Sequence, residues 1–130
     1  MTYINQMPRR ALHTVVETPE FRRRSRKLLT DDERVALTDH LAATPEAGDI
    51  MQGCGGARKV RWAIGEKGKS GGVRVITFYS GALVPVFLLT LFGKGEKVDL
   101  SRGERNELRG VLAELVAAYR EGVRMHVQGR

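Results

Sequence analysis

Four segments of the chain carry the apolar pattern of β-strands. Each is rich in β-branched and aromatic residues and is bounded by glycine, proline or short polar residues. These segments are residues 12–18, 57–64, 72–79 and 84–92. The turn SGAL at 80–83 is short, which predicts that the last two strands are antiparallel neighbours. The last strand is apolar almost throughout, so we expect it to be central, with both faces covered.

Three other segments have the apolar spacing and the end signals of helices. The first begins at Pro19, with Thr18 as its N-cap. The second and the third each open with a capping box, in which a Ser or Thr and a Glu three residues later bond to backbone N–H groups. These boxes join Thr30 to Glu33 and Ser101 to Glu104. We expect the second helix to end near Thr44, before Pro45, and the third near Gly122.

The order of these elements predicts the class of the fold. One strand, two helices, three strands and a helix (β-α-α-β-β-β-α) indicate an α+β domain, with helices packed on one face of a small, mostly antiparallel sheet. A chain of 130 residues suits one domain of ordinary size. We expect this domain at 12–122, with a loose N-terminal arm at 1–11 and a C-terminal tail at 123–130.

The composition indicates in which cellular compartment the protein works and excludes some kinds of site. No apolar run is long enough to span a bilayer, and the N-terminus lacks the apolar middle of a signal peptide, so we expect a cytoplasmic protein outside the membrane. Cys54 is the single cysteine, which excludes an internal disulfide and a cysteine-based zinc site. Its neighbours are glycines, and we interpret it as a small loop residue rather than as a reactive thiol.

Positive charge is concentrated in one part of the chain. The formal net charge is +7 and the pI is near 10.1. Residues 58–75 (RKVRWAIGEKGKSGGVRV) hold six cations against Glu66, and six minus one is +5. A charge that only kept the protein soluble would be spread out, so this cluster indicates a polyanionic partner such as RNA. The six cations are Arg58, Lys59, Arg61, Lys67, Lys69 and Arg74.

The cluster suits the cleavage of RNA without histidine. The 2′-hydroxyl of the RNA can attack the adjacent phosphate if the protein aligns the attack and stabilises the added charge. Like charges lower the pKa of a neighbouring lysine, which would let it act as base or acid. Arg74 shares a strand face with Ile76 and Phe78, and this placement is costly unless Arg74 faces a groove, binds an anion or pairs with an acid such as Glu96 or Asp99.

Other site chemistries find little support in the sequence. The segment GEKGKSGG at 65–72 contains Gly and Lys without the spacing of a phosphate-binding P-loop. His13, His40 and His126 lie far apart in the chain, and no nucleophile-elbow motif accompanies them. We therefore expect neither a metal nor a cofactor.

Four segments resemble the RelE/HigB-like toxins of type II toxin–antitoxin systems. They are ETPEF (17–21), TPEAGDIMQGCGGARKVRW (44–62), GKSGGVRVITFY (68–79) and FLLTLFGKGEKVDLS (87–101). The resemblance covers about residues 12–119. It implies a RelE-like microbial ribonuclease fold, antiparallel apart from the first strand. It also implies metal-independent cleavage of mRNA in the ribosomal A site, and three partners: a helix-turn-helix antitoxin, the ribosome and mRNA.

The resemblance further implies roles for individual cations. Arg74 would hold the scissile phosphate, and Lys67 or Lys69 would act as base or stabilise the transition state. The catalytic cations of the family fall here on Arg61, Lys67, Lys69, Arg74 and Lys94. We expect further RNA contacts from Arg58, Lys59 and Lys97, and from Arg22, Arg23 and Arg26 of the first helix, which equally fit a solvated helix face. Where some members carry an Arg and a Tyr, this chain has Gly95 and the segment VDL at 98–100, so the general acid and base stay unassigned.

Two alternatives remain open from the sequence. A ParE-like toxin of the same superfamily would inhibit DNA gyrase through protein contacts, and it would have no need of a phosphate site. A non-catalytic RNA- or ribosome-binding module would need only the basic composition. The density of cations in the hairpin favours RNA over gyrase as the target, and the non-catalytic module ranks last because only composition supports it.

Overall fold

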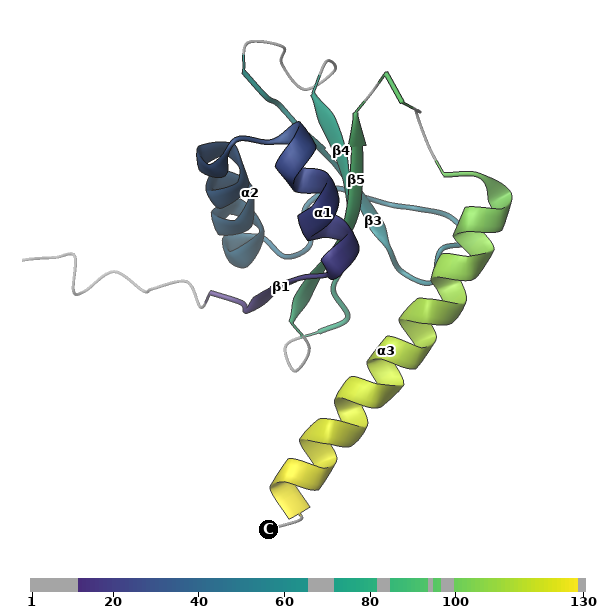
Figure 1. Ribbon diagram of the computed structural model, residues 1–130. Helices are drawn as coiled ribbons and strands as arrows, with labels where there is room; N and C mark the ends of the chain where they lie inside the picture. The colour runs from purple at the N-terminus through teal and green to yellow at the C-terminus, as the bar shows by residue number, and fades with distance from the viewer. Residues whose placement is uncertain (1–11, 66–71, 82–84, 94, 97–99, 129–130) are drawn as a thin grey trace, which may run out of the picture.

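A mixed sheet forms the centre of the molecule. The computed structural model describes residues 12–65, 72–81, 85–93, 95–96 and 100–128. Within them the fold is α+β, with a five-stranded sheet and three helices (Figure 1). The elements in chain order are β1 (Val15–Glu17), α1 (Pro19–Leu28), α2 (Asp31–Ala43), β2 (Asp49–Ile50), β3 (Arg58–Trp62), β4 (Val73–Phe78), β5 (Val86–Gly93) and α3 (Arg102–Gln128).

The strands are arranged in the order β1-β5-β4-β3-β2. The expected antiparallel pairing of β4 with β5 is confirmed, and β3 pairs with β4 in the same sense. Only β1 runs parallel to its neighbour, β5. The sequence did not predict β2, because two residues in a glycine-rich link are too short to show a period. Its pairing with β3 extends the sheet by one short edge strand.

The helices cover both faces of the sheet, so the expectation of helices on one face is wrong. Phe21 of α1 and Leu37 of α2 pack in one core with Val75. Leu112 of α3 packs in a second core with Ile76. Figure 1 shows α3 on the side of the sheet away from α1 and α2. The physical reason is that every residue of β4 is buried, and a strand buried on both faces needs cover from both sides.

The helix starts are the best-predicted features of the fold. The Thr18 hydroxyl accepts a hydrogen bond from the backbone N–H of Phe21 at 3.2 Å and lies within 3.0 Å of the Leu88 carbonyl, so the cap also ties α1 to β5. Both predicted capping boxes are present. They join Thr30 to Glu33 and Ser101 to Glu104.

The end of the last helix was predicted wrongly. α3 does not stop near Gly122 but continues to Gln128, six residues into the expected tail. A glycine inside a helix costs about 1 kcal/mol relative to alanine, which is too little to end a helix that other residues favour. The C-terminal part of α3 extends past the sheet (Figure 1). The arm expected at 1–11 falls outside the described residues, and no described helix is long and apolar enough to cross a membrane.

The glycine-rich link holds α3 close to the sheet. A Cβ atom on Gly55 would lie 3.2 Å from the Cα of Arg109 in α3, so the helix backbone approaches this loop closely. Gly55 also has a φ of 70°, which L residues rarely adopt. Cys54 beside it lies in a turn and is fully buried in the α3 core, which agrees with its interpretation as a small loop residue.

Candidate functional site

Two arginines from the basic segment lie directly opposite each other on neighbouring strands. In the register of β3 and β4, Arg61 is the partner of Arg74, and Arg74 is in turn the partner of Phe92 in β5. Alternation along β4 puts Arg74 on the face of Ile76 and Phe78, which is the face that α3 covers. Arg61 lies on the same face, because its neighbours Val60 and Trp62 pack in the opposite core.

The two arginines differ in their access to solvent. Arg61 is exposed, whereas Arg74 is only 6 % exposed. Directly opposed residues of an antiparallel pair have Cβ atoms about 5 Å apart, and like charges at this spacing destabilise the sheet. A bound phosphate would relieve this repulsion, and an arginine fork is suited to two of its oxygens. The pair therefore forms a cationic site with one buried and one accessible member.

A third cation lies on the same face. Lys59 is two residues before Arg61, is half-buried, and is the register partner of Asp49 in the edge strand β2 and of Ile76 in β4. An acid in the neighbouring strand reduces the net charge that Lys59 presents. Of the three cations on this face that the structure describes, Arg61 is therefore the one best placed to meet an incoming polyanion.

Four of the predicted site residues cannot be placed. Lys67, Lys69, Lys94 and Lys97 lie outside the described residues. The described residues that border their segments are Gly65, Gly72 and Gly93. Val73, next to Gly72, pairs with both Trp62 and Gly93, so these borders lie at the end of the sheet that carries Arg61 and Arg74. The chain connectivity thus agrees with the predicted grouping, while the side-chain geometry of the lysines stays a prediction.

A carboxylate holds one border of the basic hairpin. Glu33 of α2 accepts a hydrogen bond from the backbone N–H of Thr30 and another from the backbone N–H of Gly65, each at 2.9 Å. The bonds from Thr30 and Gly65 stabilise the charged form and lower the pKa of Glu33 below its ordinary value. The capping box of α2 therefore also fixes the point where the chain leaves β3 toward the hairpin.

The other border is fixed by packing. Gly72 is fully enclosed, and a Cβ atom at this position would lie 2.0 Å from the backbone oxygen of Trp62. Only glycine allows this contact between the two ends of the hairpin. Gly72, directly before β4, is therefore required for a steric reason.

Arg58 does not join the pair of arginines. It alternates with Val60 and Trp62 and so lies on the α1/α2 face of the sheet. Its Nη1 donates to the backbone oxygen of Glu46 at 3.0 Å, and its Nε is buried without a hydrogen-bond partner among the described residues. These contacts indicate a structural role at the end of α2.

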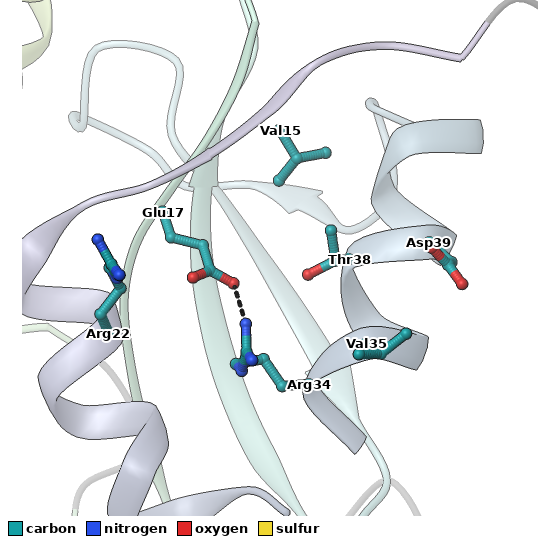
Figure 2. A pocket seen from close by; sticks show the side chains of 7 residues that line it. All are labelled: Val15, Glu17, Arg22, Arg34, Val35, Thr38 and Asp39. Atoms are coloured by element: carbon teal, nitrogen blue, oxygen red, sulfur yellow. Dashed lines mark hydrogen bonds and ion pairs between the residues drawn. The ribbon is translucent and has the colours of Figure 1, made fainter. Parts of the chain in front are cut away.

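Arg22 and Arg26 of α1 lie beside β1 and α2, on the face of the sheet opposite to Arg61 and Arg74. Arg22 borders a cleft of about 320 Å³ between β1, α1 and α2. Figure 2 shows its side chain beside Glu17, which binds Arg34 of α2 at 3.1 Å. Arg23 pairs with Glu20 of its own helix, and Arg26 is exposed. Arg22 and Arg26 therefore belong to a basic surface separate from that of Arg61.

Sequence reasoning missed the pairing of Arg24 with Glu96. Arg24 of α1 donates to both carboxylate oxygens of Glu96, at 2.7 and 2.6 Å, and its Nε donates to the backbone oxygen of Leu91. The sequence offered Glu96, together with Asp99, as an acid with which Arg74 could pair. No local sequence pattern predicts the observed contact, because Arg24 and Glu96 are 72 positions apart.

The histidines described with their side chains lie against aromatic rings. His13 makes an edge-to-face contact with Tyr79 at 5.2 Å between ring centroids, and His40 lies 5.3 Å from Trp62. In the part of the chain that the structure describes, no three His, Cys, Asp or Glu side chains are grouped to hold a metal ion.

No family model matches the sequence.

Proposed function

We propose that the protein is the toxin of a type II toxin–antitoxin system and a ribosome-dependent endoribonuclease that cleaves mRNA in the A site. The observation that carries the proposal is the opposition of Arg61 and Arg74 on one sheet face, at the end where the lysine-rich hairpin leaves and returns. The α+β fold with a mixed sheet and the four sequence segments quoted above support the same reading.

The proposed reaction uses the RNA as its own nucleophile. The 2′-oxygen forms a bond to the adjacent phosphorus while the bond from phosphorus to the 5′-oxygen breaks, which leaves a 2′,3′-cyclic phosphate and a 5′-hydroxyl. A base takes the 2′ proton, and an acid protonates the leaving oxygen. Arg74 holds the phosphate, Arg61 stabilises the charge of the transition state, and Lys67, Lys69 and Lys94 are the candidates for proton transfer.

The proposed partners follow from this role. A helix-turn-helix antitoxin would neutralise the toxin, and the ribosome would position the mRNA, which places the protein in the cytoplasm. Arg22, Arg23 and Arg26 then offer a second basic surface on α1 for ribosomal RNA. Lys59 and Lys97 would add contacts to the mRNA backbone, and such contacts make binding depend strongly on salt.

The test is primer extension on a defined mRNA, incubated with the purified protein with and without translating ribosomes. We expect cuts at fixed codon positions only when ribosomes are present. The variant Arg74→Lys keeps the charge and removes the fork, and we expect it to lose most of the cleavage while it stays folded by circular dichroism. A folded and fully active Arg74→Lys protein would contradict the role of Arg74.

Other outcomes redirect the proposal. Cuts without ribosomes would show a self-sufficient nuclease. An absence of cuts in both reactions would overturn the endonuclease proposal, and a DNA supercoiling assay with gyrase would then test the ParE-like alternative. Salt-dependent binding of RNA without a product would favour the non-catalytic module.

A further inference from the structure

An apolar groove runs along the outer edge of β5, between α1 and the first turns of α3. Its volume is about 600 Å³. β1 pairs with β5 only as far as Leu88, so from Leu89 onward this edge is bordered by α1 and α3. The apolar lining comes from the sheet and from α3, and it includes Leu89, Phe92, Leu100, Leu108 and Val111.

The rim of this groove has a charge opposite to that of the whole chain. Among the described residues, its charged lining consists of Arg24 and four acids, so one minus four is −3, on a chain of +7. Arg24 is bound by Glu96, and Glu20 pairs with Arg23. Glu107 is exposed and has no hydrogen bond or ion pair among the described residues. A phosphate backbone would be repelled here, and a basic partner would be attracted.

The groove also has an exposed apolar side chain on its α3 wall, which a partner protein could cover. Val111 of α3 is 49 % exposed and lies one helical turn after Glu107, on the same side of the helix. Leu108 lies between them and is half-buried. From Glu104 to Val111 the wall of the groove is two turns of α3, or about 10 Å at 1.5 Å per residue.

The edge of β5 favours a helix over an added strand as the occupant. A partner strand would need the outward carbonyls of β5, and these already have donors. The backbone N–H of Thr18 donates to Leu88 at 3.1 Å, the Thr18 hydroxyl lies 2.9 Å from the oxygen of Leu89, and Arg24 donates to Leu91. Recognition must therefore come from side chains, as when an amphipathic helix lies in a groove.

We propose that this groove binds an amphipathic helix of a partner protein, with apolar side chains one turn apart and Lys or Arg on both sides of the apolar stripe. The apolar side chains fill the space over Leu108 and Val111, and the cations meet Glu107 and the other acids of the rim. The proposal does not depend on the ribonuclease activity, because it rests on the lining of this groove and not on Arg61 or Arg74.

The test measures fluorescence anisotropy with two labelled 18-residue helical peptides that share one leucine stripe. One carries lysine on both sides of the stripe, and the other carries glutamate. On charge alone a protein of +7 would prefer the glutamate peptide. We expect the lysine peptide to bind at least about tenfold more tightly, which corresponds to about 1.4 kcal/mol.

Two variants with matched controls locate the binding. Glu107→Lys and Val111→Asp should each lower the affinity for the lysine peptide by about tenfold. The first change reverses a charge on the rim, and the second removes an apolar contact. Glu114→Lys on the same helix and Val35→Asp on α2 are equally exposed changes outside the groove, and they should leave the affinity unchanged. A preference for the glutamate peptide, no binding of the lysine peptide, or equal effects of test and control variants would overturn the proposal.

Discussion

Arg61 and Arg74 lie directly opposite each other in the β3–β4 register, and only Arg61 is exposed. Two like charges therefore occupy directly opposed positions on neighbouring strands. A bound phosphate would reduce the repulsion between the two guanidinium groups, and an arginine fork is suited to phosphate oxygens.

The first prediction concerns this repulsion. Arg61→Gln should raise the stability of the free protein by about 0.5 kcal/mol, because it removes one of two opposed like charges. The same change should lower ribosome-dependent cleavage by about 10²-fold, the usual effect of losing one donor to a transition-state charge. Thermal unfolding and single-turnover primer extension measure the two effects.

The matched control is Arg120→Gln on the exposed side of α3, which changes the net charge by the same amount. It should leave both stability and cleavage unchanged. If Arg61→Gln destabilised the free protein, the two arginines would be held by contacts that outweigh their repulsion.

The second prediction concerns the dependence of stability on pH. The pKa of Glu33 is lowered in the folded state by the N–H groups of Thr30 and Gly65. A lowered folded pKa contributes stability that is present above the unfolded pKa and is lost as the pH falls through the folded pKa. Glu33→Gln should therefore flatten the acid limb of the stability curve, with its largest effect near neutral pH.

Urea unfolding from pH 7 down to pH 3 measures this effect. Glu114→Gln, an exposed carboxylate of α3, serves as the control and should leave the shape of the curve unchanged. An unaltered acid limb in Glu33→Gln would show that the bonds to Thr30 and Gly65 do not persist in solution.

The third prediction compares two glycines. At Gly72 a Cβ atom would lie 2.0 Å from the backbone oxygen of Trp62, so Gly72→Ala must push the ends of β3 and β4 apart. We expect a loss of at least about 3 kcal/mol in the free energy of unfolding. Gly110 in α3 has no atom within 4 Å of such a Cβ, and Gly110→Ala should stabilise the protein by about 1 kcal/mol. Denaturant titrations of the two variants should move in opposite directions.

The fourth prediction concerns the single thiol. Cys54 is fully buried in the core under α3. A thiol without solvent access does not meet an aqueous reagent, so its labelling rate should follow the opening of the protein rather than the reactivity of the thiol. Labelling with a thiol-specific chromogenic reagent should be slow in buffer and complete within minutes in urea. Rapid labelling of the folded protein would show that the loop at 51–57 opens independently of the core.

Local sequence determined much of the fold. Each helix start was predicted, because a cap depends on residues within one turn of each other, as Thr30 and Glu33 are. The four longer strands were located within three residues at either end, because their apolar residues and bounding turns are local as well. The sequence did not predict the two-residue strand β2 or the continuation of α3 through Gly122. Neither feature is specified by a local sequence pattern.

For the candidate site, the alternation along one strand placed Arg74 on the same face as Ile76 and Phe78. The clustering of the cations was visible directly in the sequence. Only the tertiary structure decided that Arg61 is the direct partner of Arg74, that α1 and α2 cover the face opposite to these arginines, and that Arg22 lies beside β1 and α2. The tertiary structure also decided that Glu96 pairs with Arg24. The period of a strand or helix tells which residues share a face, but the element that covers that face is chosen by packing between segments that are distant in the chain.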